Sequence, residues 1–116
     1  MINPASLDEE ALKRKIEQAR EAAEIANKTK PRASSANYDR DTNEIVIQLK
    51  SGAIYRFPVD IAQGLAGASP EDLAEVEVTP SGDGLHWEKL DADFSVPGLL
   101  AGIFGTKAWM ERLQDR

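Results

Sequence analysis

The sequence predicts an α+β fold: a small antiparallel β-meander of about four strands with short helices, preceded by a long N-terminal helix and closed by a C-terminal helix. Small and apolar residues recur at helical spacing near the N-terminus, and apolar residues alternate with polar ones between residues 36 and 79. Gly, Pro and Asn separate these stretches. A chain of 116 residues suits one domain with an appended helix. We expect an amphipathic helix over residues 1–30 and an α+β domain over residues 31–116.

The N-terminal segment predicts one amphipathic helix. Ser6, with Glu9 three residues later, forms a capping box that satisfies free backbone N–H groups at a helix start. Small and apolar residues then recur at spacings of four and three, which places them on one face. This candidate helix interface comprises Leu12, Ile16, Ala19, Ala23 and Ala26. Because only two of them are large, we expect the face either to pack on the rest of the chain or to pair with a second copy at close approach.

A β region follows Pro31, which ends the helix. Alternating apolar residues predict strands over residues 36–39, 45–49 and 53–57. Ser51–Gly52 is typical of a tight two-residue turn, so the last two of these strands form a hairpin.

Short helices and further strands are expected beyond residue 58. Residues 59–65 favour a short helix, and Ser69 followed by Pro70 is typical of the start of another. A further strand is predicted over residues 75–79, and residues 80–84 form a turn that leads into Leu85, His86 and Trp87.

The C-terminal part predicts a helical turn over residues 96–101 and a terminal helix from Thr106. We expect Trp109, with Phe104 and Ile103, to anchor that terminal helix on the domain.

Charge is unevenly placed in a chain of net charge −6 at pH 7. The segment 71–93 carries Lys89 as its only base and eight acids: Glu71, Asp72, Glu75, Glu77, Asp83, Glu88, Asp91 and Asp93. Phosphate backbones bind through Lys and Arg clusters, so this part of the chain is a poor candidate for nucleic acid. An acidic face suits a basic partner protein or a cation, although acids also serve solubility alone.

The amino-acid composition also bears on the cellular compartment of the protein. The chain has no Cys, which excludes disulfides and thiolate metal sites. No apolar run reaches the ~20 residues of a membrane span, and the first residues lack the pattern of a signal peptide. We therefore expect a cytoplasmic protein that does not enter a membrane.

The segment from Gly84 to Gly102 concentrates the residues most suited to function. Its candidate interaction surface comprises Leu85, His86, Trp87, Leu90, Asp91 and Asp93. Trp87, with Leu85 and Leu90, also fits a core position, because aromatic side chains bury ~150–250 Å² each. His86 is the only histidine, and we expect it to be half-buried and to donate a hydrogen bond to a turn carbonyl or to Asp91.

Catalytic or metal-binding chemistry finds little support in this segment. A site of two histidines and one carboxylate needs a second histidine, and Ser81 and Ser95 lie in turn contexts that explain a serine without a nucleophile. We expect no catalytic residues, cofactor or metal. The alternative is a cation-binding or small-ligand-binding protein, or a small enzyme, centred on His86, Asp91 and Asp93.

The stretches YDRDTNEIVIQLKSGAIYRFPVD and GLAGASPEDLAEVEVTPSGDGLHWEKLDADFSVPGLL resemble the bacterial domain of unknown function 2442. The resemblance covers roughly Ala33 to Trp109, and G-L-H-W and L-D-x-D-x-S-V-x-G-L-L are its most specific elements. Glu88 stands where similar proteins usually carry Pro. The resemblance implies a β-meander with short helices and no established activity. Some similar proteins append a helix-turn-helix, and others are encoded beside a small protein in an arrangement suggestive of toxin–antitoxin pairs.

Together these observations favour a non-catalytic protein-interaction or regulatory module of a bacterial cytoplasmic protein, with an antitoxin-like role implied by the resemblance. The expected partner is another protein or a second copy of the chain. A second alternative is a DNA-associated regulator acting through basic residues of the N-terminal helix, such as Lys13, Arg14 and Arg20. Glu17, Glu21 and Glu24 are interleaved with them and weaken their field, so nucleic acid is not the expected partner.

Overall fold

The computed structural model describes the backbone of residues 4–115 and the side chains of residues 9–21 and 30–115. The chain divides into two compact units, residues 1–30 and 31–116, and each is described by itself. The first contains the helix α1 (Pro4–Thr29), of 26 residues. The helix begins two residues before Ser6, so the expected capping box does not mark its start. A proline in the first turn replaces one of the backbone N–H groups that lack a helical partner there.

The second unit opens with a three-stranded antiparallel sheet, in the order β1 (Ala33–Asp39), β2 (Glu44–Leu49) and β3 (Ile54–Pro58). The predicted inner face is present, since Ile45, Ile47 and Leu49 of β2 are buried, but Val46 on the opposite face is buried as well. The turn between β2 and β3 is longer than the two residues expected. The amide of Leu49 donates to the carbonyl of Ala53, so three residues lie between the paired ends.

Two short helical segments connect the sheets. The expected helix over residues 59–65 is only a 3-10 turn, Val59–Ile61, followed by further turns. The second helix, α2 (Pro70–Leu73), begins as predicted, because the Ser69 hydroxyl accepts a hydrogen bond of 3.2 Å from the amide of Asp72.

A second three-stranded antiparallel sheet follows, in the order β4 (Glu77–Val78), β5 (Gly84–Trp87) and β6 (Ala92–Ser95). The described residues thus form six strands where we expected about four, and the α+β class is confirmed. The sheet is tied to β1 by Gly82, whose carbonyl accepts from the amide of Ala33 at 2.6 Å. Gly82 has a φ of +80°, and a Cβ there would lie 2.6 Å from the carbonyl oxygen of Ala33, so this contact requires glycine.

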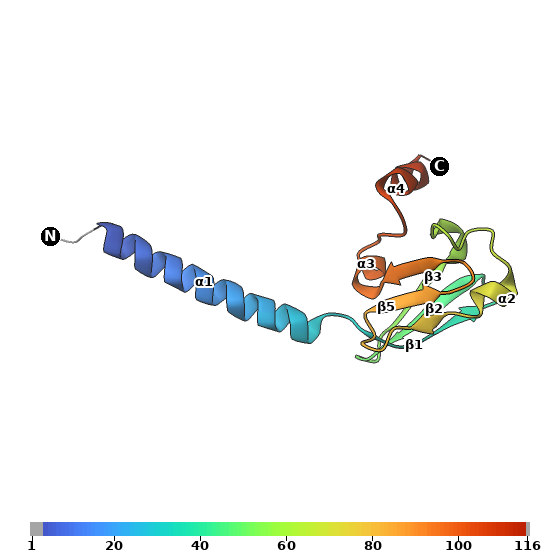
Figure 1. The fold of residues 1–116 in the computed structure, drawn as a ribbon, viewed down its shortest axis with the longest axis horizontal. Coiled ribbons are helices and arrows are strands. Elements are labelled where there is room, and N and C mark those ends of the chain that lie inside the picture. Colours follow the sequence, from blue (N-terminus) through green and yellow to red (C-terminus); the bar gives the residue numbers. More distant parts are fainter. Residues whose placement is uncertain (1–3, 116) are drawn as a thin grey trace. The chain divides into compact units, whose positions relative to one another are not determined.

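The last two helices are α3 (Val96–Leu100) and α4 (Lys107–Gln114), and Figure 1 shows α3 directly after β6. Both helices begin with a side-chain cap: the hydroxyls of Ser95 and Thr106 accept backbone N–H groups three residues on.

Both sheets and the connecting segments contribute to one hydrophobic core. Its largest fully buried side chains include Trp87, Phe57, Ile45 and Ile47. The indole Nε1 of Trp87 donates to the carbonyl of Leu73 at 3.0 Å, which satisfies the one polar atom of the ring. Within the described part of the chain, no helix has the length and apolar character needed to cross a membrane.

Candidate functional site

The strand register brings His86 and Asp93 together on the outer face of the second sheet. His86 of β5 lies opposite Asp93 of β6, and Nδ1 of His86 is 2.6 Å from Oδ1 of Asp93. Asp93 is 72% exposed at the side chain and His86 33%. The sequence placed His86 correctly as half-buried, but its partner is Asp93 and neither Asp91 nor a turn carbonyl. Asp91 lies in the β5–β6 turn with a φ of +47°, where it is not opposite His86.

Acidic neighbours raise the pKa of His86 above 6.5. The main cause is the hydrogen bond to Asp93, which favours the protonated ring, while burial of the ring opposes it. The negative charges of Asp93, Glu77 and Glu88 add to the increase. Glu77 and Asp93 on the outer face of this sheet, together with Glu88 and Asp91 in the β5–β6 turn, are called the acidic face below. The side chain of Lys89, close in sequence, pairs with Glu75 at 3.2 Å.

The structure separates the predicted interaction surface into two sets. Leu85 and Trp87 are only 1% and 0% exposed, so the prediction that they lie on the surface is wrong. In β5 their side chains alternate with His86 and point into the core, because successive residues of a strand face opposite sides. Leu90 is partly buried against the core. His86, Asp91 and Asp93 remain accessible.

The residues of the predicted helix interface lie in the first unit. Leu12 and Ile16 are 58% and 45% exposed, and Ala19 is exposed as well. The side chains of Ala23 and Ala26 lie outside the described residues.

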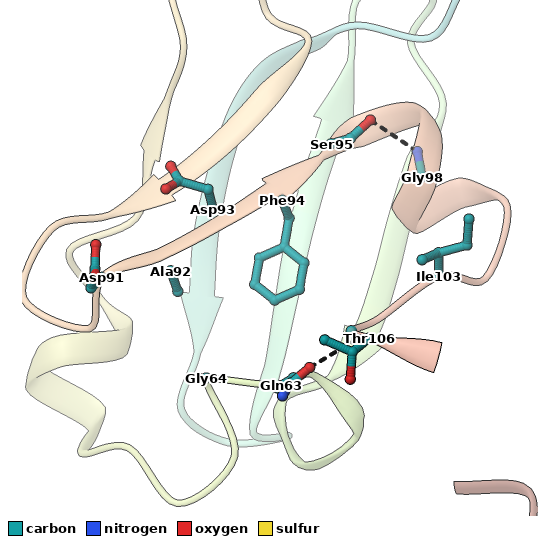
Figure 2. A pocket seen from close by; sticks show the side chains of 11 residues that line it. Gln63, Gly64, Asp91, Ala92, Asp93, Phe94, Ser95, Gly98, Ile103 and Thr106 are labelled. Atoms are coloured by element: carbon teal, nitrogen blue, oxygen red, sulfur yellow. Dashed lines mark hydrogen bonds between the residues drawn. The ribbon is translucent and has the colours of Figure 1, made fainter. Parts of the chain in front are cut away.

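A hollow of about 440 Å³ runs beside β6. Figure 2 shows the ring of Phe94 pointing into it from β6, with Gln63 and Thr106 on the far side and Ile103 at one end. The amide of Thr106 donates to Oε1 of Gln63 at 2.8 Å, which fixes that far wall. Gly105 lies against the same wall: a Cβ there would be 2.7 Å from the Cβ of Gln63.

Sequence reasoning missed the apolar part of this hollow. We expected Ile103 to anchor the last helix, but it is 56% exposed. Phe94 alternates with Asp93 in the stretch DADFS, a period of two that indicates a strand with one acidic and one apolar face. That signal was available, but the same acids also suit turns and helix caps.

The geometry does not assemble a metal centre from the predicted ligands. Among the residues that the structure describes, no group of three or more His, Asp or Glu side chains is placed to hold a metal ion. His86 and Asp93 form a pair without Asp91 as a third ligand. Likewise, in the described structure no serine or threonine hydroxyl forms a hydrogen bond with His86.

The fold and the hollow define a small α+β protein with an acidic sheet face beside an open, partly apolar groove. The chain belongs to the family described as "Protein of unknown function (DUF2442)", which matches residues 33–105. This confirms the resemblance noted in the sequence.

Two solved structures are similar to the chain. One is the crystal structure of a protein of unknown function from Rhodospirillum rubrum, with 54% identity and a TM-score of 0.68; the similarity covers 71% of this chain and 99% of that one. The other is the solution structure of an uncharacterized protein from Chromobacterium violaceum, with 34% identity and a TM-score of 0.67, covering 84% of this chain and 90% of that one. No curated protein matches the chain.

Proposed function

We propose that residues 31–116 form a non-catalytic protein-interaction module of a bacterial cytoplasmic protein, with a regulatory and antitoxin-like role. The observation that carries the proposal is the hollow beside β6. It combines an exposed apolar side chain, Ile103, with a half-buried ring, Phe94, next to the carboxylates of Asp91 and Asp93. Apolar contact area beside charged groups is the composition of a protein-binding surface with a hydrophobic centre and a polar rim.

Electrostatics supports a basic partner. Glu77 and Asp93 of the acidic face lie on the strands on either side of His86, and Glu88 and Asp91 lie in the β5–β6 turn. Lys89 is engaged by Glu75. A partner with Lys or Arg residues would associate faster through this field, and its binding would weaken as salt screens the charges.

The alternative of a cation-dependent protein has less support, because the described carboxylates do not converge around His86 in a group of three. The alternative of a DNA-associated regulator depends on α1. There Arg14 lies 3.9 Å from Glu10 in an exposed pair, so part of its charge is balanced within the helix.

Site-specific photocrosslinking tests the proposal. A benzoylphenylalanine at position 103 should crosslink to a discrete partner in cells of the native host. The matched control is position 54, because Ile54 is 62% exposed but lies on the first sheet. Asp93→Lys should abolish the crosslink from position 103, and the purified partner should bind the wild-type chain more weakly at higher salt. Equal crosslinking from positions 103 and 54, or none from position 103, would overturn the proposal.

A further inference from the structure

β6 is an edge strand of the second sheet. It pairs with β5 on one side, and no strand among the described residues pairs with it on the other. The hollow lies along residues 91–95, with Gln63 and Thr106 as its opposite wall. The space next to the strand is therefore open where a further strand would lie.

The hydrogen-bond pattern shows which backbone groups face that space. The amide of Val96 donates to the carbonyl of Asp83 at 2.9 Å, and the register continues with Ser95 opposite Gly84. Because bonded and non-bonded pairs alternate in an antiparallel ladder, Phe94 and Ala92 direct their backbone groups toward β5. It follows that the N–H and C=O of Asp93, and the N–H of Ser95, point away from β5.

The hydrogen bonds between β4 and β5 lead to the same assignment of the outward backbone groups of β6. The amide of Thr79 donates to the carbonyl of Gly84 at 3.0 Å, so the backbone N–H and C=O of Gly84 point toward β4. The backbone groups of the next residue, Leu85, therefore point toward β6. Leu85 is paired with Phe94. The backbone groups of Phe94 therefore form hydrogen bonds with β5, and those of Asp93 point away from β5.

Side chains on the outer face form a row across the three strands. Glu77 of β4 lies opposite His86, and His86 lies opposite Asp93. On a strand added beside β6, the residue facing Asp93 would extend this row. Opposite charges in that position are favourable and like charges unfavourable, so this residue should be Lys or Arg.

The neighbours of that basic residue would face the other way. Since side chains alternate along a strand, they would enter the hollow with Phe94 and Ile103. Phe94 is itself held in place by its edge-to-face contact with Trp87, at 5.9 Å between ring centroids. Apolar side chains suit this position.

We propose that the module binds an extended segment of a basic partner, which adds to β6 as a fourth strand and carries the pattern apolar–basic–apolar at its centre. This inference rests on the proposed function, whose partner it specifies. Main-chain hydrogen bonds to Asp93 and Ser95 would give affinity, and the hollow and the acidic face would give the sequence preference.

A second copy of the chain is a poorer occupant of the same edge. An antiparallel pair of β6 strands centred on Asp93 would place two Asp93 carboxylates directly opposite each other, which is destabilising. The edge thus discourages self-association while accepting a basic strand.

Nuclear magnetic resonance of the ¹⁵N-labelled full chain, titrated with the peptide acetyl-Lys-Val-Arg-Val-Lys-amide, tests the proposal. At saturation, the outward amides of Asp93 and Ser95 should exchange with solvent about tenfold more slowly. The amides of Ala92 and Phe94, which already bond to β5, serve as the internal control and should change little.

Two control peptides separate strand addition from charge attraction. Methylation of the central arginine amide removes the donor facing Asp93 but keeps the charge, and it should abolish the protection. The peptide acetyl-Glu-Val-Glu-Val-Glu-amide keeps the backbone and reverses the charge, and it should not bind. Asp93→Asn should weaken binding about two- to fivefold. Ile103→Ser should also weaken it, whereas Ile54→Ser should not.

The outcomes distinguish this inference from the proposed function. Protection by the methylated peptide, or shifts of acidic residues without protection of Asp93, would show that a strand does not add at this edge. A crosslinked partner at position 103 would then still support an interaction module that uses another binding mode. Binding that produces a dimer of the chain, measured by sedimentation, would overturn the choice of a foreign partner.

Discussion

His86 illustrates how a single residue takes its environment from strand register. The residues DAD place acids two positions apart, and only the pairing of β5 with β6 decides that Asp93 faces the ring. Asp93 and His86 form a non-bonded pair of the ladder, in which side chains approach most closely. Their distance of 2.6 Å follows from that geometry. A sequence alone does not give register, so we predicted the half-buried ring but assigned the wrong carboxylate.

The pKa of His86 provides a test at the same scale. Its pKa is raised in the folded chain, so the stabilisation by Asp93 is present below the unfolded value of 6.5 and is lost as the pH rises through the folded pKa. Asp93→Asn should lower the pKa of the ring. The stability difference between this variant and the wild-type chain should be larger at pH 6 than at pH 8.5.

Ring resonances followed by nuclear magnetic resonance would measure that pKa, and thermal unfolding at the two pH values would measure the difference. Asp91→Asn is the matched control, since Asp91 is not among the groups that shift His86. An equal effect of both substitutions would show that general acidity, rather than the contact, sets the pKa.

At the scale of elements, the helix cap at Ser69 was predicted from the sequence, whereas strand β6 was not. Ser69, Ser95 and Thr106 accept backbone N–H groups at helix starts, a local interaction that needs only neighbouring residues. β6 was not predicted as a strand, because its four residues contain two acids or caps and gain their structure from pairing with β5. Strand preference depends on such non-local packing.

The terminal helix α4 depends on a few contacts with the rest of its unit. It has no fully buried residue. Nε1 of Trp109 donates to the carbonyl of Ile61 at 2.8 Å, and Sδ of Met110 lies 3.3 Å from the amide of Phe104. The prediction that Trp109 anchors this helix agrees with these contacts, whereas Ile103 is too exposed to contribute much.

Trp109→Phe should therefore loosen α4 without unfolding the sheets. Phenylalanine keeps an aromatic ring, although a smaller one than the indole, and it has no N–H group, so the carbonyl of Ile61 loses its partner at a cost of about 1–3 kcal/mol. Hydrogen exchange followed by mass spectrometry should show faster exchange in residues 107–114 and little change in β2. Arg112→Ala is the control, because Arg112 lies over the Trp109 ring at 5.8 Å without a bond to Ile61. Faster exchange throughout both sheets would mean that α4 is part of the cooperative core.

At the scale of the whole molecule, the predicted fold class is confirmed because it depends on patterning. The buried face formed by Ile45, Ile47 and Leu49 in β2 and the core position of Trp87 are properties of residue type and period, which the sequence displays directly. The hollow beside β6 depends on the close approach of Gln63, Gly105 and Thr106 from distant parts of the chain. Contacts between loops leave no periodic pattern in the sequence. The sequence could therefore indicate the acids of the site but not its apolar wall.

The distribution of the core gives a last prediction. Every buried apolar residue of the described structure lies between Ala33 and Phe104, so a chain of residues 31–116 should fold without α1. Its free energy of unfolding in urea should lie within about 0.5 kcal/mol of the full-length value, and its dependence on denaturant should be similar, because this dependence follows the surface exposed by the cooperative unit. Both tryptophans lie in this part of the chain, so their fluorescence reports the same transition in both proteins.

A clearly lower midpoint of urea unfolding for the shorter chain would show that α1 belongs to the same cooperative unit. The helix would then be a structural support, and its exposed Leu12 and Ile16 could no longer be assigned to a separate docking element.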